Sequence, residues 1–133
     1  MTTDDLLKLL GNHEDNFVER KQEGVKDAEL RQTLCAFANT VPDGRVAVLF
    51  IGLHDKTGDP TGVSNPDQLQ KRVREVCHDD CYPPLEYKSE VLTVEGKAIV
   101  AVVVPHSTAR PHFAGPCLRA RWFAEPQGVP TAV

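Results

Sequence analysis

The fold is decided by the stretch RVAVLFIGL, residues 45–53, a nearly unbroken run of apolar side chains. A strand that is apolar at every position, and not at every second one, is expected at the centre of a sheet that is covered on both faces. We therefore predict a central strand over residues 45–53. The polar turn of residues 54–58, which contains Asp55 and Lys56, follows it directly.

Two main helices are predicted, one before and one after this strand in the sequence. Apolar residues recur at the helical period from Asp27 to about Thr40, with Asp27 placed to cap the helix and residues 42–44 to end it. Further along, Asn65 and Pro66 provide a cap residue and a proline for the first turn, and an apolar stripe continues to Cys77. Both helices are expected to pack on the sheet.

The remaining elements complete a mixed sheet. Thr3 can cap a short helix that ends near Leu10. Strands are expected over residues 15–22, 85–94, 97–104 and 115–123, and Glu95-Gly96 is expected to form a tight hairpin turn. We predict an α+β fold, with two main helices packed on a mixed β-sheet and a short N-terminal helix. One domain is expected over residues 1–125, and residues 126–133 are expected to form a C-terminal tail.

Composition limits the possible classes of function. With 133 residues, 41% hydrophobic and 26% charged, the chain suits one globular domain, and no apolar run is long enough to cross a bilayer. The N-terminus is acidic where a secretory signal would be basic, so we expect a cytoplasmic protein with no membrane partner and no disulfide. The net charge of -4 argues against binding DNA by bulk attraction alone.

Charge is, however, segregated along the chain. Residues 96–124 contain four basic residues and no carboxylate, namely Lys97, Arg110, Arg119 and Arg121. Arg119 and Arg121 lie two apart, so both would project from one strand face and could bind phosphate oxygens. The alternative is an ordinary solvated face that pairs with nearby acids. The first thirty residues, in contrast, are rich in carboxylates.

Some of these carboxylates are candidate metal ligands. Glu14 and Glu19 precede the helix predicted from Asp27, and Asp55 follows the central strand. Carboxylate oxygens suit Mg²⁺ or Mn²⁺, and Lys21 could stabilise negative charge in a transition state. Glu19 and Lys21 share a strand face, but Glu14, five residues before Glu19, needs a bend to join them. The alternative is that all four are ordinary solvated charges.

The same segments resemble a known family, the Schlafen Alba-like DNA-binding domain. The resemblance extends over roughly residues 10–124, and its segments follow the family's order and spacing. They are Glu14–Lys21, Leu34–Thr40, Phe50–Asp55, Val102–Ser107, Arg110–His112 and Leu118–Arg121. The chain departs from the family where Val41-Pro42-Asp43-Gly44 replaces a second glycine, and where His54 replaces an acidic or polar residue that could influence metal preference.

This resemblance implies nucleic-acid binding and, as in better-understood members, metal-dependent cleavage of RNA by two glutamates and an aspartate. By position these would be Glu14, Glu19 and Asp55. The leading hypothesis is thus a metal-dependent endoribonuclease acting on structured RNA such as tRNA. The alternative is a non-catalytic module that binds RNA or single-stranded or duplex DNA, and a third is a protein-interaction domain. A homodimer is expected, because one small domain offers little groove.

Other sites are not expected. Cys77 and Cys81 lack a second cysteine pair, so no zinc site is expected, and Cys77 fits the core. Glycine-rich phosphate-binding loops of the usual kinds do not occur in the sequence, so no nucleotide cofactor is expected. Asn39 is interpreted as a residue that caps its helix.

Overall fold

The computed structural model describes residues 3–9, 17–109 and 111–114 of the chain. Its main sheet has the strand order β1-β2-β5-β4, formed by β1 (Val18–Lys21), β2 (Val46–Ile51), β5 (Lys97–Pro105) and β4 (Lys88–Val94). The pair β1 and β2 is parallel, whereas β2 with β5 and β5 with β4 are antiparallel. The predicted mixed sheet is thereby confirmed, with the predicted central strand inside it.

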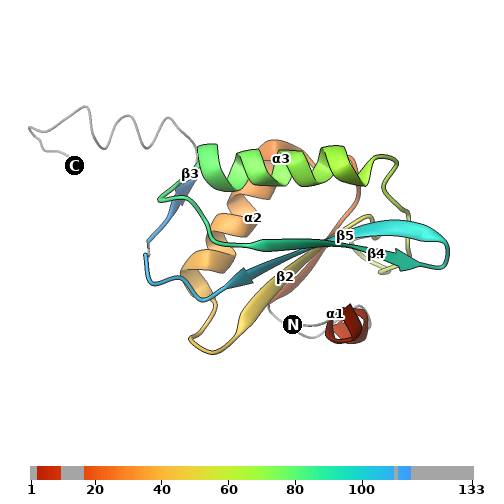
Figure 1. The fold of residues 1–133 in the computed structure, drawn as a ribbon, viewed down its shortest axis with the longest axis horizontal. Coiled ribbons are helices and arrows are strands. Elements are labelled where there is room, and N and C mark those ends of the chain that lie inside the picture. Colours follow the sequence, from red (N-terminus) through yellow and green to blue (C-terminus); the bar gives the residue numbers. More distant parts are fainter. Residues whose placement is uncertain (1–2, 10–16, 110, 115–133) are drawn as a thin grey trace, which may run out of the picture.

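Helices cover the sheet unequally. Figure 1 shows α2 (Asp27–Thr40) and α3 (Pro66–Asp79) side by side on one face, and the short α1 (Thr3–Leu9) against the other. Side chains of β2 alternate between two cores, because Leu49 and Ile51 pack towards α2 and α3 while Val48 and Phe50 pack with Leu6 of α1. Burial on both faces is why this strand is apolar throughout. The predicted α+β architecture is confirmed.

The predicted start of α3 is confirmed and that of α2 is partly wrong. The Asn65 side chain accepts a hydrogen bond from the backbone N–H of Gln68 at 3.1 Å, as an N-cap does. Asp27 is the first helical residue and not the cap, since Lys26 occupies the cap position without a side-chain hydrogen bond. The Asp27 carboxylate instead accepts two hydrogen bonds from Arg72 of α3, at 3.0 and 2.7 Å. It therefore joins the two helices.

The β4–β5 hairpin is confirmed, with a shorter first strand than predicted. Glu95 and Gly96 both have positive φ, 51° and 77°, the conformation that a two-residue turn between antiparallel strands favours. Strand β4 begins at Lys88 and not at Leu85. Leu85 is buried, and its N–H donates to the carbonyl of Cys77 at the end of α3, at 2.9 Å. The chain just before Lys88 therefore packs against the C-terminal end of α3.

A small second sheet was not predicted. Strands β3 (Cys81–Tyr82) and β6 (Phe113–Ala114) pair antiparallel beside the C-terminal end of α3. Two-residue strands are too short to produce a recognisable period in sequence. The predicted strand over residues 115–123 and the tail over 126–133 lie outside the described residues. Across the described ranges, none of the helices is long and apolar enough to cross a membrane.

Candidate nucleic-acid and metal site

The centre of the candidate site is a lysine between two carboxylates. The Nζ atom of Lys21 lies 3.3 Å from an Oε atom of Glu29 and 3.9 Å from one of Glu19. The Lys21 side chain is 23% exposed, whereas Glu19 and Glu29 are 48% and 54% exposed. One ammonium group is thus held at the surface by acids from two elements, the strand β1 and the helix α2.

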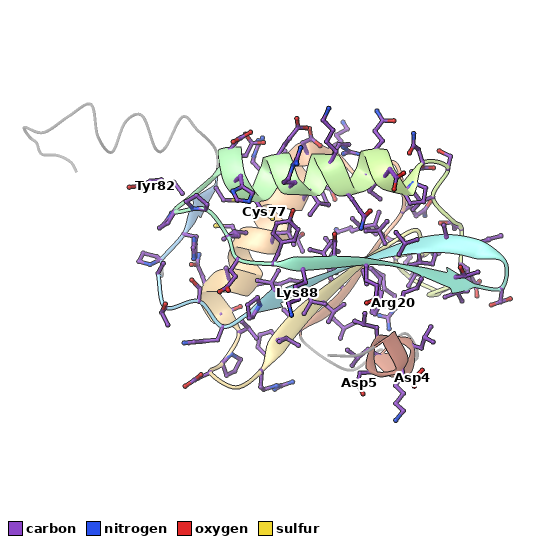
Figure 2. All side chains as sticks on the ribbon, in the orientation of Figure 1. Asp4, Asp5, Arg20, Cys77, Tyr82 and Lys88 are labelled. Carbon is purple, nitrogen blue, oxygen red and sulfur yellow. The ribbon has the colours of Figure 1, made fainter. Side chains whose placement is uncertain are left out.

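Strand alternation explains the position of Glu19 and Lys21. In the parallel pairing with β2, Glu19 lies beside Leu49 and Lys21 beside Ile51, so both are on the sheet face that α2 and α3 cover. The predicted shared face is confirmed. Arg20, between them, points to the opposite face and is buried, and Figure 2 shows it on the side of α1.

Glu29 was not identified from the sequence. It is the third residue of α2, and the turn between β1 and α2 brings it back over the end of β1. The N–H of Val25 donates to the carbonyl of Gln22 at 3.1 Å and so closes this turn. The signal available in the sequence was weak, because an acid in the first turn of a helix is common for electrostatic reasons alone.

The loop that contains Asp55 begins next to Lys21. The backbone N–H groups of Gly52 and Leu53 both donate to the carbonyl of Lys21, at 2.7 and 3.1 Å. Gly52 has φ 112°, and a Cβ atom there would lie 3.0 Å from the side chains of Ile99 and Val63. Only glycine fits this crowded, left-handed position. The exit from β2 is therefore fixed against the end of β1.

His54 organises the tip of this loop. Its Nδ1 atom accepts hydrogen bonds from the N–H groups of Lys56 and Thr57, at 3.2 and 3.3 Å. An accepting Nδ1 has no proton, so its 3.7 Å contact with Asp55 is not an ion pair in this state. The Asp55 side chain is 57% exposed. Asp55 and Lys56 are therefore presented to solvent on a loop with an ordered backbone.

The described residues supply part of a metal site. Glu14 lies outside them, and within the part of the chain that is described, no three His, Cys, Asp or Glu residues gather into a group that could hold a metal ion. Mg²⁺ commonly binds proteins through one or two carboxylates and keeps several waters. Glu19 and Asp55 are both exposed, and each fits the role of one such carboxylate ligand. The complete set of three carboxylates stays a prediction.

Of the residues predicted to contact phosphate, some are described by the structure and others are not. Lys21 and Lys56 are described, and both lie at the end of the β1–β2 pair from which the Asp55 loop leaves. Arg110, Arg119 and Arg121 lie outside the described residues, so their predicted role in binding phosphate stays a prediction.

Asn39 has a different role from the predicted cap. Its amide donates to the carbonyl of His112 at 3.0 Å and accepts from the N–H of the same residue at 2.7 Å. The buried His112 ring contacts the carbonyl oxygen of Pro83 through Nδ1 and the hydroxyl of Ser107 through Nε2, both at 2.6 Å. The segment after β5 is thereby fixed to the end of α2.

Three buried thiols lie near this anchor. Cys35, Cys77 and Cys81 are all free, and Figure 2 shows Cys77 on the side of α3 that faces α2 and the sheet. Burial raises the pKa of Cys77 to about 12. A hydrogen bond between the thiols of Cys35 and Cys81 lowers the pKa of Cys35 and raises that of Cys81. Cys77 belongs to the core, as predicted.

Comparisons with known proteins show which family and which folds the chain resembles. Residues 14–122 match the family model described as Schlafen, AlbA_2. The N-terminal domain of a RecG-related protein from Nitrosomonas europaea has a similar structure, with a TM-score of 0.67 and 26% sequence identity over 84% of this chain and 78% of that one. The DIP2311 protein from Corynebacterium diphtheriae shares the fold, with a TM-score of 0.58 and 18% identity over 84% of this chain and 23% of that one. No curated protein matches.

Proposed function

Because the chain belongs to the Schlafen AlbA_2 family, we propose that it binds nucleic acid and cleaves structured RNA, such as tRNA, with the help of a divalent metal ion. The observation that carries the proposal is the position of Glu19 and Lys21 on one strand face, beside the loop that presents Asp55 and Lys56. Basic groups are needed there because a phosphodiester is anionic and its cleavage adds negative charge. Acidic groups are needed to hold the metal ion.

A structural neighbour supports the class of ligand. The RecG-related protein is named for its relation to an ATP-dependent DNA helicase, an enzyme that acts on nucleic acid. That name speaks for nucleic acid in general and not for RNA in particular. The choice of RNA for this chain rests on the family resemblance of its three carboxylates, and it needs a direct test.

Each residue of the site has a proposed task. Glu19 and Asp55, together with Glu14, would hold Mg²⁺ or Mn²⁺, which supplies Lewis-acid activation of water and of the phosphodiester when bound. Lys21 would contact the phosphate at which negative charge develops. Lys56 would position the nucleic-acid backbone, together with Arg110, Arg119 and Arg121.

The proposal includes a homodimer that works in the cytoplasm. A single domain of this size offers a short surface to a folded RNA, and a second copy related by twofold symmetry would double it. A reducing compartment would keep the free thiols of Cys35, Cys77 and Cys81 in the state described above. Sedimentation analysis of the purified protein, with and without tRNA, measures the oligomeric state.

The central test compares cleavage with binding. Purified protein is incubated with tRNA and with single-stranded DNA, with Mn²⁺ or with EDTA, beside the Glu19→Ala and Asp55→Ala variants. We expect cleavage of tRNA that requires Mn²⁺ and is lost in both variants, while tRNA affinity in EDTA changes little. Cleavage that survives EDTA or Asp55→Ala would contradict a metal-dependent reaction at this site.

A non-catalytic binding module is the second candidate. It requires the basic groups of the site, such as Lys21 and Lys56, and no metal ligands. This candidate predicts tRNA or DNA binding at low salt without cleavage under any metal condition. A protein-interaction domain predicts no nucleic-acid affinity even at low salt, where phosphate contacts are strongest.

A further inference from the structure

The ammonium group proposed to meet phosphate already has an anionic partner. Glu29 is the nearer of the two carboxylates at Lys21, at 3.3 Å against 3.9 Å for Glu19. The contact between Lys21 and Glu29 is also a hydrogen bond from Nζ to Oε2. Carboxylate and phosphate oxygens bind an ammonium group in the same way, through charge-assisted hydrogen bonds.

We propose that Glu29 is an internal competitor of the nucleic-acid backbone: its carboxylate binds Lys21 in the free protein, and a phosphate group must displace it. This inference rests on the proposed function, since it assumes that Lys21 meets phosphate. Glu29 opposes binding in two ways. It neutralises the Lys21 ammonium, and its own charge repels an approaching phosphate. It thus sets how tightly the site binds nucleic acid and favours ligands that make several phosphate contacts at once.

The position of Glu29 suits an exchange of partners. The carboxylate is 54% exposed, so water can solvate it once Lys21 leaves. Glu29 lies in the first turn of the 14-residue helix α2, where the helix dipole favours a negative charge whether or not Lys21 is bound. Displacing Glu29 therefore costs little, and Lys21 can move to phosphate without leaving a buried charge behind.

Neither Glu19 nor Asp27 can take this role. Glu19 is farther from the ammonium and is a proposed metal ligand. Asp27, in the same helical turn, accepts two hydrogen bonds from Arg72 and joins α2 to α3. Glu29 is thus the acid of this turn that faces the proposed phosphate contact.

The test measures tRNA affinity in EDTA, so that no cleavage is required. Glu29→Gln keeps the size of the side chain and removes its charge. Glu75→Gln, an exposed position on α3, changes the net charge by the same amount and is the matched control. We expect Glu29→Gln to increase affinity about two- to fivefold, the range that an exposed ion pair supports, and Glu75→Gln to have a smaller effect.

A double variant shows whether the effect passes through Lys21. Lys21→Gln should weaken binding, and adding Glu29→Gln to it should raise affinity by less than Glu29→Gln does alone, because only the direct repulsion of phosphate is then removed. A full Glu29→Gln effect in the absence of Lys21 would overturn the inference. So would an unchanged affinity in Glu29→Gln, combined with equal losses of melting temperature in Glu29→Gln and Lys21→Gln, because the pair would then only stabilise the turn between β1 and α2.

A second readout needs no nucleic acid. Acylation of lysine amines, followed by peptide mass spectrometry, should modify Lys21 faster in Glu29→Gln than in the wild type, with Lys56 as internal reference. An equal rate in both proteins would overturn the proposed contact. Failure of the wild type to bind tRNA at low salt would overturn the proposed function and this inference with it. Wild-type binding that Glu29→Gln leaves unchanged would overturn this inference alone.

Discussion

The side-chain amide of Asn39 pairs with the backbone of His112, donating at 3.0 Å and accepting at 2.7 Å. This geometry copies the way in which two strands exchange hydrogen bonds, with a side chain in place of one strand. It joins the C-terminal turn of α2 to a segment 73 residues away. The amide of Asn39 therefore pairs with the chain just before β6 as a neighbouring strand would.

Asn39→Ala should destabilise the protein by about 1–3 kcal/mol, because the N–H of the buried His112 loses its partner and the His112 carbonyl keeps only the thiol of Cys35, at 3.0 Å. Urea unfolding followed by circular dichroism measures the free energy. Thr40→Ala, at the next residue, is the control. It removes an exposed hydrogen bond from the Thr40 hydroxyl to the carbonyl of Ala36 and should cost less. Equal effects of the two substitutions would contradict the role assigned to Asn39.

Gly52→Ala should destabilise the loop that contains Asp55. The added Cβ would lie 3.0 Å from two buried side chains, at a φ of 112° that alanine rarely adopts. A cost of about 1–3 kcal/mol in unfolding free energy follows from strain of this kind. Gly24→Ala is the control, since a Cβ there meets no atom within 4 Å. Equal stability of the Gly52 and Gly24 variants would show that the exit from β2 tolerates a side chain.

Glu23 should make stability depend on pH. Its carboxylate accepts hydrogen bonds from the hydroxyl and the backbone N–H of Ser64, at 2.6 and 2.8 Å, and these lower its pKa below the ordinary 4.5. Folding therefore favours the charged form. The stabilisation is complete above the ordinary pKa and is lost as the pH falls through the lowered value.

Unfolding in urea at a series of pH values, for the wild type and Glu23→Gln, tests this dependence. The wild type should be the more stable near neutral pH, and the difference should shrink as the solution is acidified below the ordinary pKa of 4.5. A difference that stays constant over this range would contradict the titration of Glu23.

Leu6 should anchor α1 to the sheet. It is 1% exposed in the core on that face, whereas its neighbour Leu7 is 40% exposed. Leu6→Ala should lower the unfolding free energy by about 2–4 kcal/mol through lost apolar burial and an unfilled cavity. Leu7→Ala should change it little. Thermal unfolding of the two variants provides the comparison, and equal losses would show that α1 packs differently.

The sequence predicts those elements whose signal is local. Residues 45–53 identify a central strand because positions 47–53 are all buried, and Asn65 with Pro66 identifies the start of α3 by local capping. Strand alternation is also local, so the shared face of Glu19 and Lys21 could be predicted. Glu95-Gly96 identifies its hairpin for the same reason.

Contacts between distant segments could not be predicted. Asp27 looked like a cap because nothing in its neighbourhood reveals Arg72, 45 residues away in the chain. Glu29 reaches Lys21 only because the turn between β1 and α2 reverses the chain, and Asn39 reaches His112 only through the packing of the second sheet. In each case a polar side chain found a tertiary partner that competed with its local role.

The carbonyl of Lys21 accepts hydrogen bonds from both Gly52 and Leu53. The strand that bears the lysine and the loop that bears Asp55 are consequently joined by main chain alone, whichever side chains the two positions carry. Replacing Lys21 removes an ammonium group and leaves this scaffold in place. If the proposed RNA cleavage is lost in such a variant, the loss can then be assigned to the missing charge, and not to a displaced aspartate.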